Sequence, residues 1–157
     1  FTGGTGSDSL NLNMPRQLPD LYEPASHDIV SISALNASLS WIIEQSVKKI
    51  YIHKKELTDY AVQRLSELSS VTLFLPENRK NHIAIISLTH TNYRPEELAD
   101  ILDNDFDIAV RSGYHCAPYV HKLIGTEDSG GTVRISIGYY NTKNDIDSLI
   151  NALRELD

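Results

Sequence analysis

Apolar residues recur every three or four positions along several stretches of the chain, which is the spacing of one face of a helix. Two such stretches follow Val30 and Lys54, and a third lies near the C-terminus. Their apolar positions are Ile32, Leu35, Leu39 and Ile42, then Leu57, Ala61, Leu65 and Leu68, and finally Ile146, Leu149, Ile150 and Leu153. Pro95, which is followed by two glutamates, predicts the start of a further helix. We expect these apolar faces to lie in the core.

Four other stretches have the pattern of strands. Residues 71–75 and 83–88 are short apolar runs, and the second is continuous enough for a central strand. Residues 106–111 and 132–140 alternate between apolar and polar positions, which is the period of a half-buried strand. In the last of these, Arg134 falls on the polar side among small residues. Together the helices and strands predict an α/β (α+β) sandwich.

The composition is that of an ordinary folded domain. Of the 157 residues, 41% are hydrophobic and 22% are charged. A formal net charge of -7 argues against nucleic acid or an anionic membrane as a partner. No apolar run approaches the ~20 residues that span a bilayer. A single cysteine cannot form an internal disulfide, which fits a reducing compartment. We therefore expect a cytoplasmic protein.

The only cysteine of the chain, Cys116, follows the third predicted strand. Gly113 and Pro118 flank it, so we expect the thiol on a loop at the end of a strand. Arg111 and His115 lie nearby in the sequence, and positive neighbours favour the thiolate form of a thiol. The alternative is a small apolar core residue, because free cysteines are usually buried and inert. The residues alone leave both interpretations open.

Two further features indicate ligand binding. The planar guanidinium of Arg134 can hold a carboxylate through two parallel hydrogen bonds, and a surface salt bridge is the alternative. The segment Gly-Gly-Thr-Gly-Ser at residues 3–7 offers consecutive amides and two hydroxyls to a phosphate. Its alternative role is simply to form turns.

Three separated motifs resemble those of one enzyme family. They are R-S-G-Y-H-C-A-P at residues 111–118, T-V-R-I-S-I-G-Y-Y-N-T at residues 132–142, and the glycine-rich segment at residues 3–7. Their order and spacing are similar to those of the class V aminotransferase family, and more narrowly to its group II cysteine desulfurase and selenocysteine lyase branch. The resemblance covers essentially the whole chain, and the three motifs together are much more specific than the glycine-rich segment alone.

The resemblance implies part of a fold-type I enzyme that depends on pyridoxal 5′-phosphate. Residues 1–42 would come from the end of the cofactor-binding large domain. Residues 43–157 would form the C-terminal small domain, a small, mostly antiparallel sheet covered by helices. The chain begins at Phe1 and lacks the lysine that carries the cofactor in this family, so we expect an inactive C-terminal fragment of a homodimeric enzyme.

The resemblance also implies roles for the residues of the two C-terminal motifs. Cys116 would attack the sulfur of L-cysteine, or the selenium of selenocysteine, and keep it as a persulfide while L-alanine is released. Arg134 would bind the substrate α-carboxylate. Arg111 would help to bind substrate, position the loop or favour the thiolate, and His115 would shuttle a proton. A sulfur-acceptor protein would then receive the sulfur.

At the N-terminus, the resemblance gives Thr5, with Gly4 beside it, a contact with the phosphate of the partner subunit's cofactor. The family's next motif, E-x-G-T-x-N, is replaced here by Glu-Pro-Ala-Ser-His-Asp at residues 23–28. Alanine in place of glycine restricts the backbone, and aspartate in place of asparagine adds a charge. This departure leaves the substrate open more than the fold.

Two alternatives stay open at this point. A class V enzyme of aminotransferase or lyase type could carry Cys116 as a bystander. A non-catalytic α/β module could bind a partner protein or dimerise. His115, Cys116 and His121 are residue types that bind metals, but a fourth ligand at a recognisable spacing is missing, so we expect no metal site.

Overall fold

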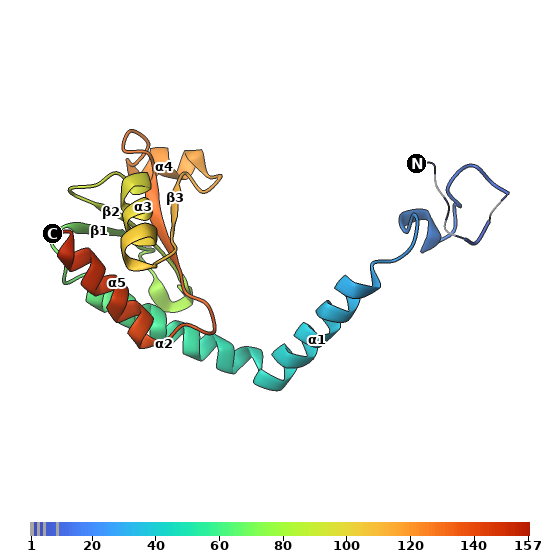
Figure 1. The fold of residues 1–157 in the computed structure, drawn as a ribbon, viewed down its shortest axis with the longest axis horizontal. Coiled ribbons are helices and arrows are strands. Elements are labelled where there is room, and N and C mark those ends of the chain that lie inside the picture. The colour runs from blue at the N-terminus through green and yellow to red at the C-terminus, as the bar shows by residue number, and fades with distance from the viewer. Residues whose placement is uncertain (1, 3, 5, 9) are drawn as a thin grey trace. The chain divides into compact units, whose positions relative to one another are not determined.

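The structure, a computed structural model, describes residue 2, residue 4, residues 6–8 and residues 10–157. Figure 1 shows its elements along the chain. The chain divides into two compact units, Phe1–Ser46 and Val47–Asp157. The domain boundary expected after residue 42 remains a prediction about the intact protein. None of the helices that the structure describes has the length and apolar character needed to cross a membrane.

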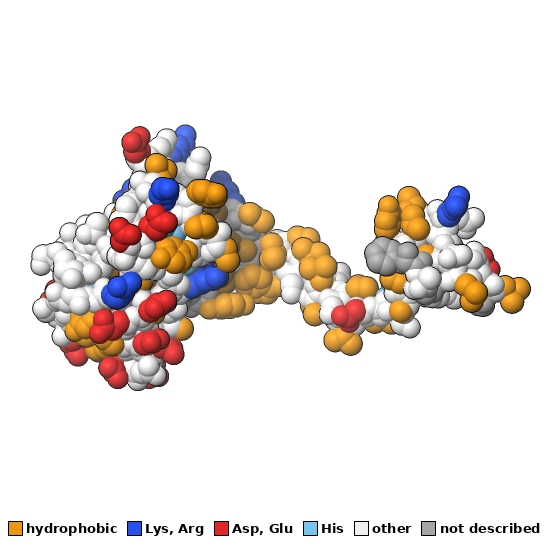
Figure 2. All heavy atoms as spheres, turned by 90° about the horizontal axis from the view of Figure 1, so that it is seen from above, with side chains coloured by type: hydrophobic (Ala, Val, Ile, Leu, Met, Phe, Trp, Pro, Cys, Tyr) orange, Lys and Arg blue, Asp and Glu red, His pale blue; other side chains and the backbone are white. Residues whose placement is uncertain are grey.

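The first unit contains a short 3₁₀ helix, η1 (Asp20–Tyr22), and helix α1 (Ile29–Gln45). Asp28 caps α1, because its carboxylate accepts a hydrogen bond from the Ser31 amide at 3.0 Å. Of the apolar stripe that we expected in a core, Ile32, Leu35 and Leu39 are exposed, Ile32 at 56%, and Ile42 is half-buried. Figure 2 shows hydrophobic side chains on the surface of the chain. The expectation is wrong for this chain because the described residues of the unit form no second layer over the stripe.

The second unit is built on a four-stranded antiparallel sheet with the order β1-β2-β4-β3. The strands are β1 (Val71–Phe74), β2 (Ile85–His90), β3 (Arg111–Gly113) and β4 (Thr132–Ser136). The helices are α2 (Val47–Leu65), η2 (Arg79–Asn81), α3 (Pro95–Phe106), α4 (Pro118–Ile124) and α5 (Lys143–Glu155). Helices α2, α3 and α5 pack on one face of the sheet (Figure 1). This confirms the predicted α/β sandwich with an antiparallel sheet.

Fully buried aliphatic side chains fill the space between the sheet and these three helices. Leu65 of α2, Leu98 of α3 and Leu153 of α5 belong to one cluster with Ile86 and Val133 of the sheet. The apolar positions predicted between residues 57 and 68 and between residues 146 and 153 are all buried. Burial of this face holds the sheet rigidly and leaves its other face available for a site.

One predicted strand is wrong in its position. The alternating residues 106–111 do not form it, because α3 runs to Phe106 and Asp107 then ends the helix in the left-handed conformation with φ 55°. Val110 still packs against the core, but strand pairing begins only at Arg111. Alternation identifies the side chains that point toward the core. A strand also needs a neighbouring strand that pairs with the same residues.

Candidate active site

A row of four side chains crosses the outer face of the sheet, which is turned away from the core. Phe74 lies opposite Ser87, and Ser87 lies opposite Arg134. Arg134 in turn lies opposite Arg111. Directly opposite residues of antiparallel strands share a face, and Val133, next to Arg134, is buried in the core on the other face. The row therefore runs from an aromatic ring on β1 to two guanidinium groups on β4 and β3.

The two arginines lie opposite each other without an acidic partner. Like charges on directly opposite residues repel one another. Within the described part of the chain, no carboxylate forms an ion pair with either guanidinium. Arg134 Nε donates a hydrogen bond to the hydroxyl of Ser136 at 3.2 Å. In a chain with a net charge of -7, this pair is a local positive centre that can attract a carboxylate.

Cys116 lies on the loop after β3, beside one of these arginines. The residue is exposed, which excludes the alternative of a buried core cysteine. Arg111 Nη2 donates to Cys116 Sγ over 3.9 Å. The structure thus brings Cys116 together with Arg111, and Arg111 together with Arg134.

The loop that presents Cys116 has an unusual backbone. Gly113, His115 and Cys116 have φ angles of 98°, 51° and 59°. A non-glycine residue in the left-handed region costs about 1–2 kcal/mol, and such residues persist where the surrounding structure holds them. The surrounding structure therefore holds the loop in this backbone conformation, which gives the thiol a defined position.

The backbone of Gly131, just before β4, lies directly against that of Gly113. A Cβ at residue 131 would clash with the Gly113 carbonyl group, and its φ of +94° favours glycine. We expect Gly131→Ala to lower the free energy of unfolding of the full-length protein by about 2 kcal/mol or more in urea denaturation. Gly125→Ala is the matched control, with φ +73° but open space at its Cβ position. The free energy of unfolding of this control should fall by only about 1 kcal/mol. Equal losses in the two variants would show that the close approach of Gly131 to Gly113 does not matter for stability.

His115 reaches from the loop to β4. Its Nε2 lies 3.1 Å from the carbonyl oxygen and 3.2 Å from the hydroxyl of Thr132. Burial lowers the pKa of His115, the positive charge of Arg134 lowers it further, and the hydrogen bond to Thr132 opposes both. Burial and the charge of Arg134 thus favour the neutral form of the ring. Thr132 could not be connected with His115 from the sequence, because the two residues come from different elements.

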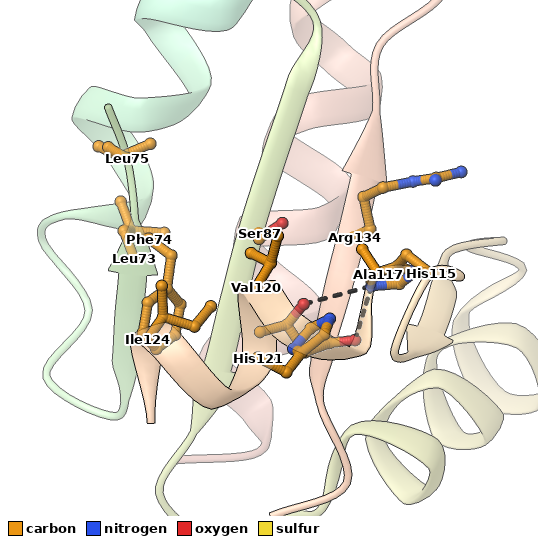
Figure 3. A pocket seen from close by; sticks show the side chains of 11 residues that line it. Leu73, Phe74, Leu75, Ser87, His115, Ala117, Val120, His121, Ile124 and Arg134 are labelled. Carbon is orange, nitrogen blue, oxygen red and sulfur yellow. Dashed lines mark hydrogen bonds between the residues drawn. The ribbon is translucent and has the colours of Figure 1, made fainter. Parts of the chain in front are cut away.

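A cavity of about 500 Å³ lies next to these residues on the outer face of the sheet. Figure 3 shows His115 and His121 together on one side of it, with the apolar side chains of Phe74 and Ile124 farther along. Arg134 also lines the cavity, and its guanidinium extends away from the apolar side chains. Helix α4, which forms part of the wall, was not predicted. A hollow with apolar and polar sides fits a small ligand with both characters.

His121 is a structural residue of this wall. The residue is buried, and its Nδ1 lies 2.8 Å from the hydroxyl of Thr126. Its ring packs edge-on against Tyr114 and lies 5.8 Å from that of His115. In the part of the chain that the structure describes, no group of three His, Cys, Asp or Glu side chains could hold a metal ion.

The residues expected to contact a cofactor phosphate belong to the first unit. Thr5 lies outside the described residues. Gly4 is exposed, and its carbonyl accepts a hydrogen bond from the Ala25 amide at 2.9 Å. The space around its Cβ position is open, so an anion could approach this backbone closely. The phosphate contact of Gly4 stays a prediction.

The segment at residues 23–28, which departs from the family motif, has a structural explanation. Ala25 adopts a φ of 68°, in the region that glycine favours, so the alanine keeps a glycine-like backbone. Asp28 accepts hydrogen bonds from the amide and the hydroxyl of Ser31 at the start of α1. Asparagine fills the same capping role in other helices. Both substitutions are therefore compatible with the local backbone structure of the segment.

Comparison with known proteins identifies the relatives of the chain. The Aminotransferase class-V family model matches residues 1–149. A probable cysteine desulfurase of Halalkalibacterium halodurans is 34% identical over 140 residues, which cover 89% of this chain and 33% of that protein. A probable cysteine desulfurase of Methanothermobacter thermautotrophicus is 31% identical over 138 residues, which cover 88% of this chain and 34% of that protein.

The chain is also similar to a solved structure of a cysteine desulfurase. The apo structure of the cysteine desulfurase from Thermococcus onnurineus NA1 matches with a TM-score of 0.78 and 30% identity, covering 88% of this chain and 33% of that one. The chain thus spans about a third of the length of these relatives. Because the family model and the fold agree over most of its length, the chain belongs to the class V aminotransferase family.

Proposed function

We propose that this chain supplies the sulfur-accepting thiol and the carboxylate-binding arginine of a pyridoxal-phosphate-dependent cysteine desulfurase. The observation that carries the proposal is the exposed thiol of Cys116, 3.9 Å from Arg111, which itself lies opposite Arg134. Similarity to proteins named cysteine desulfurase supports it. The activity is that of the full-length protein, because the chain spans a third of its relatives.

In this proposal, Arg134 binds the α-carboxylate of L-cysteine through two parallel hydrogen bonds. Its Nε is engaged with Ser136, so the two terminal nitrogens meet the ligand. Arg111, on the opposite strand, adds positive potential and strengthens the attraction for the anion. The substrate is thereby anchored next to the strand that leads to the thiol.

Cys116 then accepts the sulfur. Its thiolate attacks the substrate sulfur, and the new S–S bond forms as the C–S bond of the substrate breaks. The electron pair of the broken bond stays on the carbon, which takes up a proton to give L-alanine. Cys116 is left as a persulfide, which a sulfur-acceptor protein can attack. Arg111 donates a hydrogen bond to Cys116 Sγ and so helps to hold the sulfur in place, and selenocysteine would react in the same way.

Pyridoxal phosphate, when bound, serves as the electron sink for the substrate carbon. We assign a contact with its phosphate to Gly4 and Thr5, and the open approach to Gly4 supports the assignment. By the resemblance to the family, this contact reaches a partner subunit, so we propose a homodimer. A single cysteine, which cannot form an internal disulfide, supports the further proposal that the protein is cytoplasmic. The lysine that binds the cofactor would lie in the remainder of the full-length protein.

The test is a single turnover of the full-length protein with L-cysteine. We expect the peptide that contains Cys116 to gain the mass of one sulfur atom, and L-alanine to appear in equal amount, as measured by mass spectrometry and amino-acid analysis. L-Serine, which lacks the sulfur, should give no mass gain. Alanine without a persulfide, or a keto acid, would contradict the proposal and favour an enzyme of lyase or aminotransferase type.

A further inference from the structure

The ring of His115 does not bond to the thiol that follows it in the chain. Nε2 lies within hydrogen-bond distance of both the carbonyl and the hydroxyl oxygen of Thr132. Nδ1 is buried and has no hydrogen-bond partner among the residues that the structure describes, which include Cys116. Neither nitrogen is therefore placed to take the proton of the thiol directly.

The position of the ring hydrogen follows from the Thr132 carbonyl. A carbonyl oxygen can only accept a hydrogen bond, so the contact with the carbonyl is a hydrogen bond in the tautomer in which Nε2 carries the hydrogen and Nδ1 keeps its lone pair. Arg134, His121 and Arg111 all oppose a positive charge on the ring. A neutral ring with a fixed donor is suited to hold a contact, whereas a proton carrier needs a nitrogen within reach of the group that it serves.

The contact holds a strained segment against the strand of the site. His115 and Cys116 are consecutive non-glycine residues with positive φ angles, a backbone that needs support from its surroundings. Thr132 is fully buried and begins β4, the strand that also carries Arg134. The His115 ring is thus a direct link between the thiol loop and the strand of the carboxylate-binding arginine.

We propose that His115 is a positioning residue, whose ring ties the Cys116 loop to Thr132 and so fixes the thiol relative to Arg111 and Arg134. The importance of this position for sulfur transfer rests on the proposed function. The tie itself does not, because it can be measured on the loop without any turnover.

Three variants of the full-length protein separate positioning from proton transfer. His115→Ala removes the ring and its hydrogen bond. His115→Gln keeps an N–H donor at the end of a side chain of similar reach but cannot titrate. The matched control is His82→Ala, which removes another ring whose Nε2 contacts a backbone carbonyl, that of Ile85 at 2.6 Å. The Thr132 carbonyl cannot be removed by substitution, so the ring is the informative partner.

The first measurement is amide hydrogen exchange over residues 113–117, followed by mass spectrometry, with helix α5 as the internal reference. In His115→Ala we expect exchange about tenfold faster in the loop than in the unchanged protein, with little change in α5, because one hydrogen bond is lost locally. His115→Gln should recover most of this protection, and His82→Ala should leave the loop as it is. A loop in His115→Ala that exchanges no faster than in His82→Ala, or an equal rise in α5, would overturn the proposal.

The second measurement is the kcat and KM for persulfide formation. We expect His115→Ala to lower kcat about tenfold with KM nearly unchanged, and His115→Gln to recover most of the rate. If His115→Gln recovers the protection but not the rate, the ring acts as a proton carrier and the positioning role is wrong. If the unchanged protein forms no persulfide, the proposed function is wrong. The exchange data would still show whether the His115 ring holds the loop against Thr132.

Discussion

Cys116→Ser should reduce alanine formation from L-cysteine by at least about 1000-fold in the full-length protein and abolish the persulfide. A serine hydroxyl is not ionised at neutral pH and cannot store a second sulfur, although it is similar in size to the thiol and exposed in the same way. The substrate should still change the absorbance of the bound cofactor, because Arg134 is intact. Alanine quantification and mass spectrometry of the loop peptide provide the measurement.

The matched control for this variant is Tyr119→Phe. Tyr119 lies in the first turn of α4, three residues from the thiol, and is 86% exposed. Removal of its hydroxyl should change the rate of alanine formation by no more than about twofold, because most substitutions of exposed residues have small effects. If Cys116→Ser kept the alanine rate, Cys116 would be a bystander, and a lyase or aminotransferase chemistry would replace the desulfurase proposal.

Arg134→Lys should raise the KM for L-cysteine about 100-fold, with a much smaller change in kcat. Lysine keeps the positive charge opposite Arg111 but cannot offer two parallel hydrogen bonds to a carboxylate. Initial-rate kinetics on the full-length protein measure the effect. The control is Arg154→Lys in α5, an exposed arginine that pairs with Glu67 at 3.6 Å, for which KM should not change.

A different result for Arg134→Lys would point to another role. If KM stayed constant while the free energy of unfolding fell, the guanidinium would be a structural group that supports β4 through Ser136. The lack of an ion pair to Arg134 among the described carboxylates argues against this outcome. Urea denaturation of the same variants separates the two explanations.

Much of the second unit could be predicted from the sequence because its elements follow local rules. The spacing of apolar residues located α2 and α5, and the alternation in β4 separated buried Val133 from Arg134. Thr142 and Asp145, three residues apart, form a capping box at the start of α5. In each case, neighbours within a few residues determine the conformation, so a single sequence contains the signal.

The parts that could not be predicted depend on contacts between distant segments. The hydrogen bonds from His115 to Thr132 and the close approach of Gly131 to Gly113 join two strands that are neighbours only in the folded sheet. No local pattern encodes a left-handed conformation at His115 and Cys116, since neither residue requires it. Sequence motifs could therefore name the thiol but not the residues that hold it.

The failed expectation for α1 has a different cause. Its periodicity correctly predicts a helix, yet most of its apolar stripe is exposed in this chain. Periodicity shows which face of a helix avoids water, but it does not show which segment covers that face. The chain spans only a third of its relatives, so the covering segment would have to be sought in the full-length protein.

The arrangement of Arg111 opposite Arg134 has a thermodynamic consequence for the protein as a whole. Their mutual repulsion disfavours the sheet whenever no counterion lies above it. A carboxylate that neutralises the pair removes this penalty and binds only to the folded chain. Occupancy and conformational stability are therefore linked through these two residues, and a substrate would protect its own binding surface from unfolding.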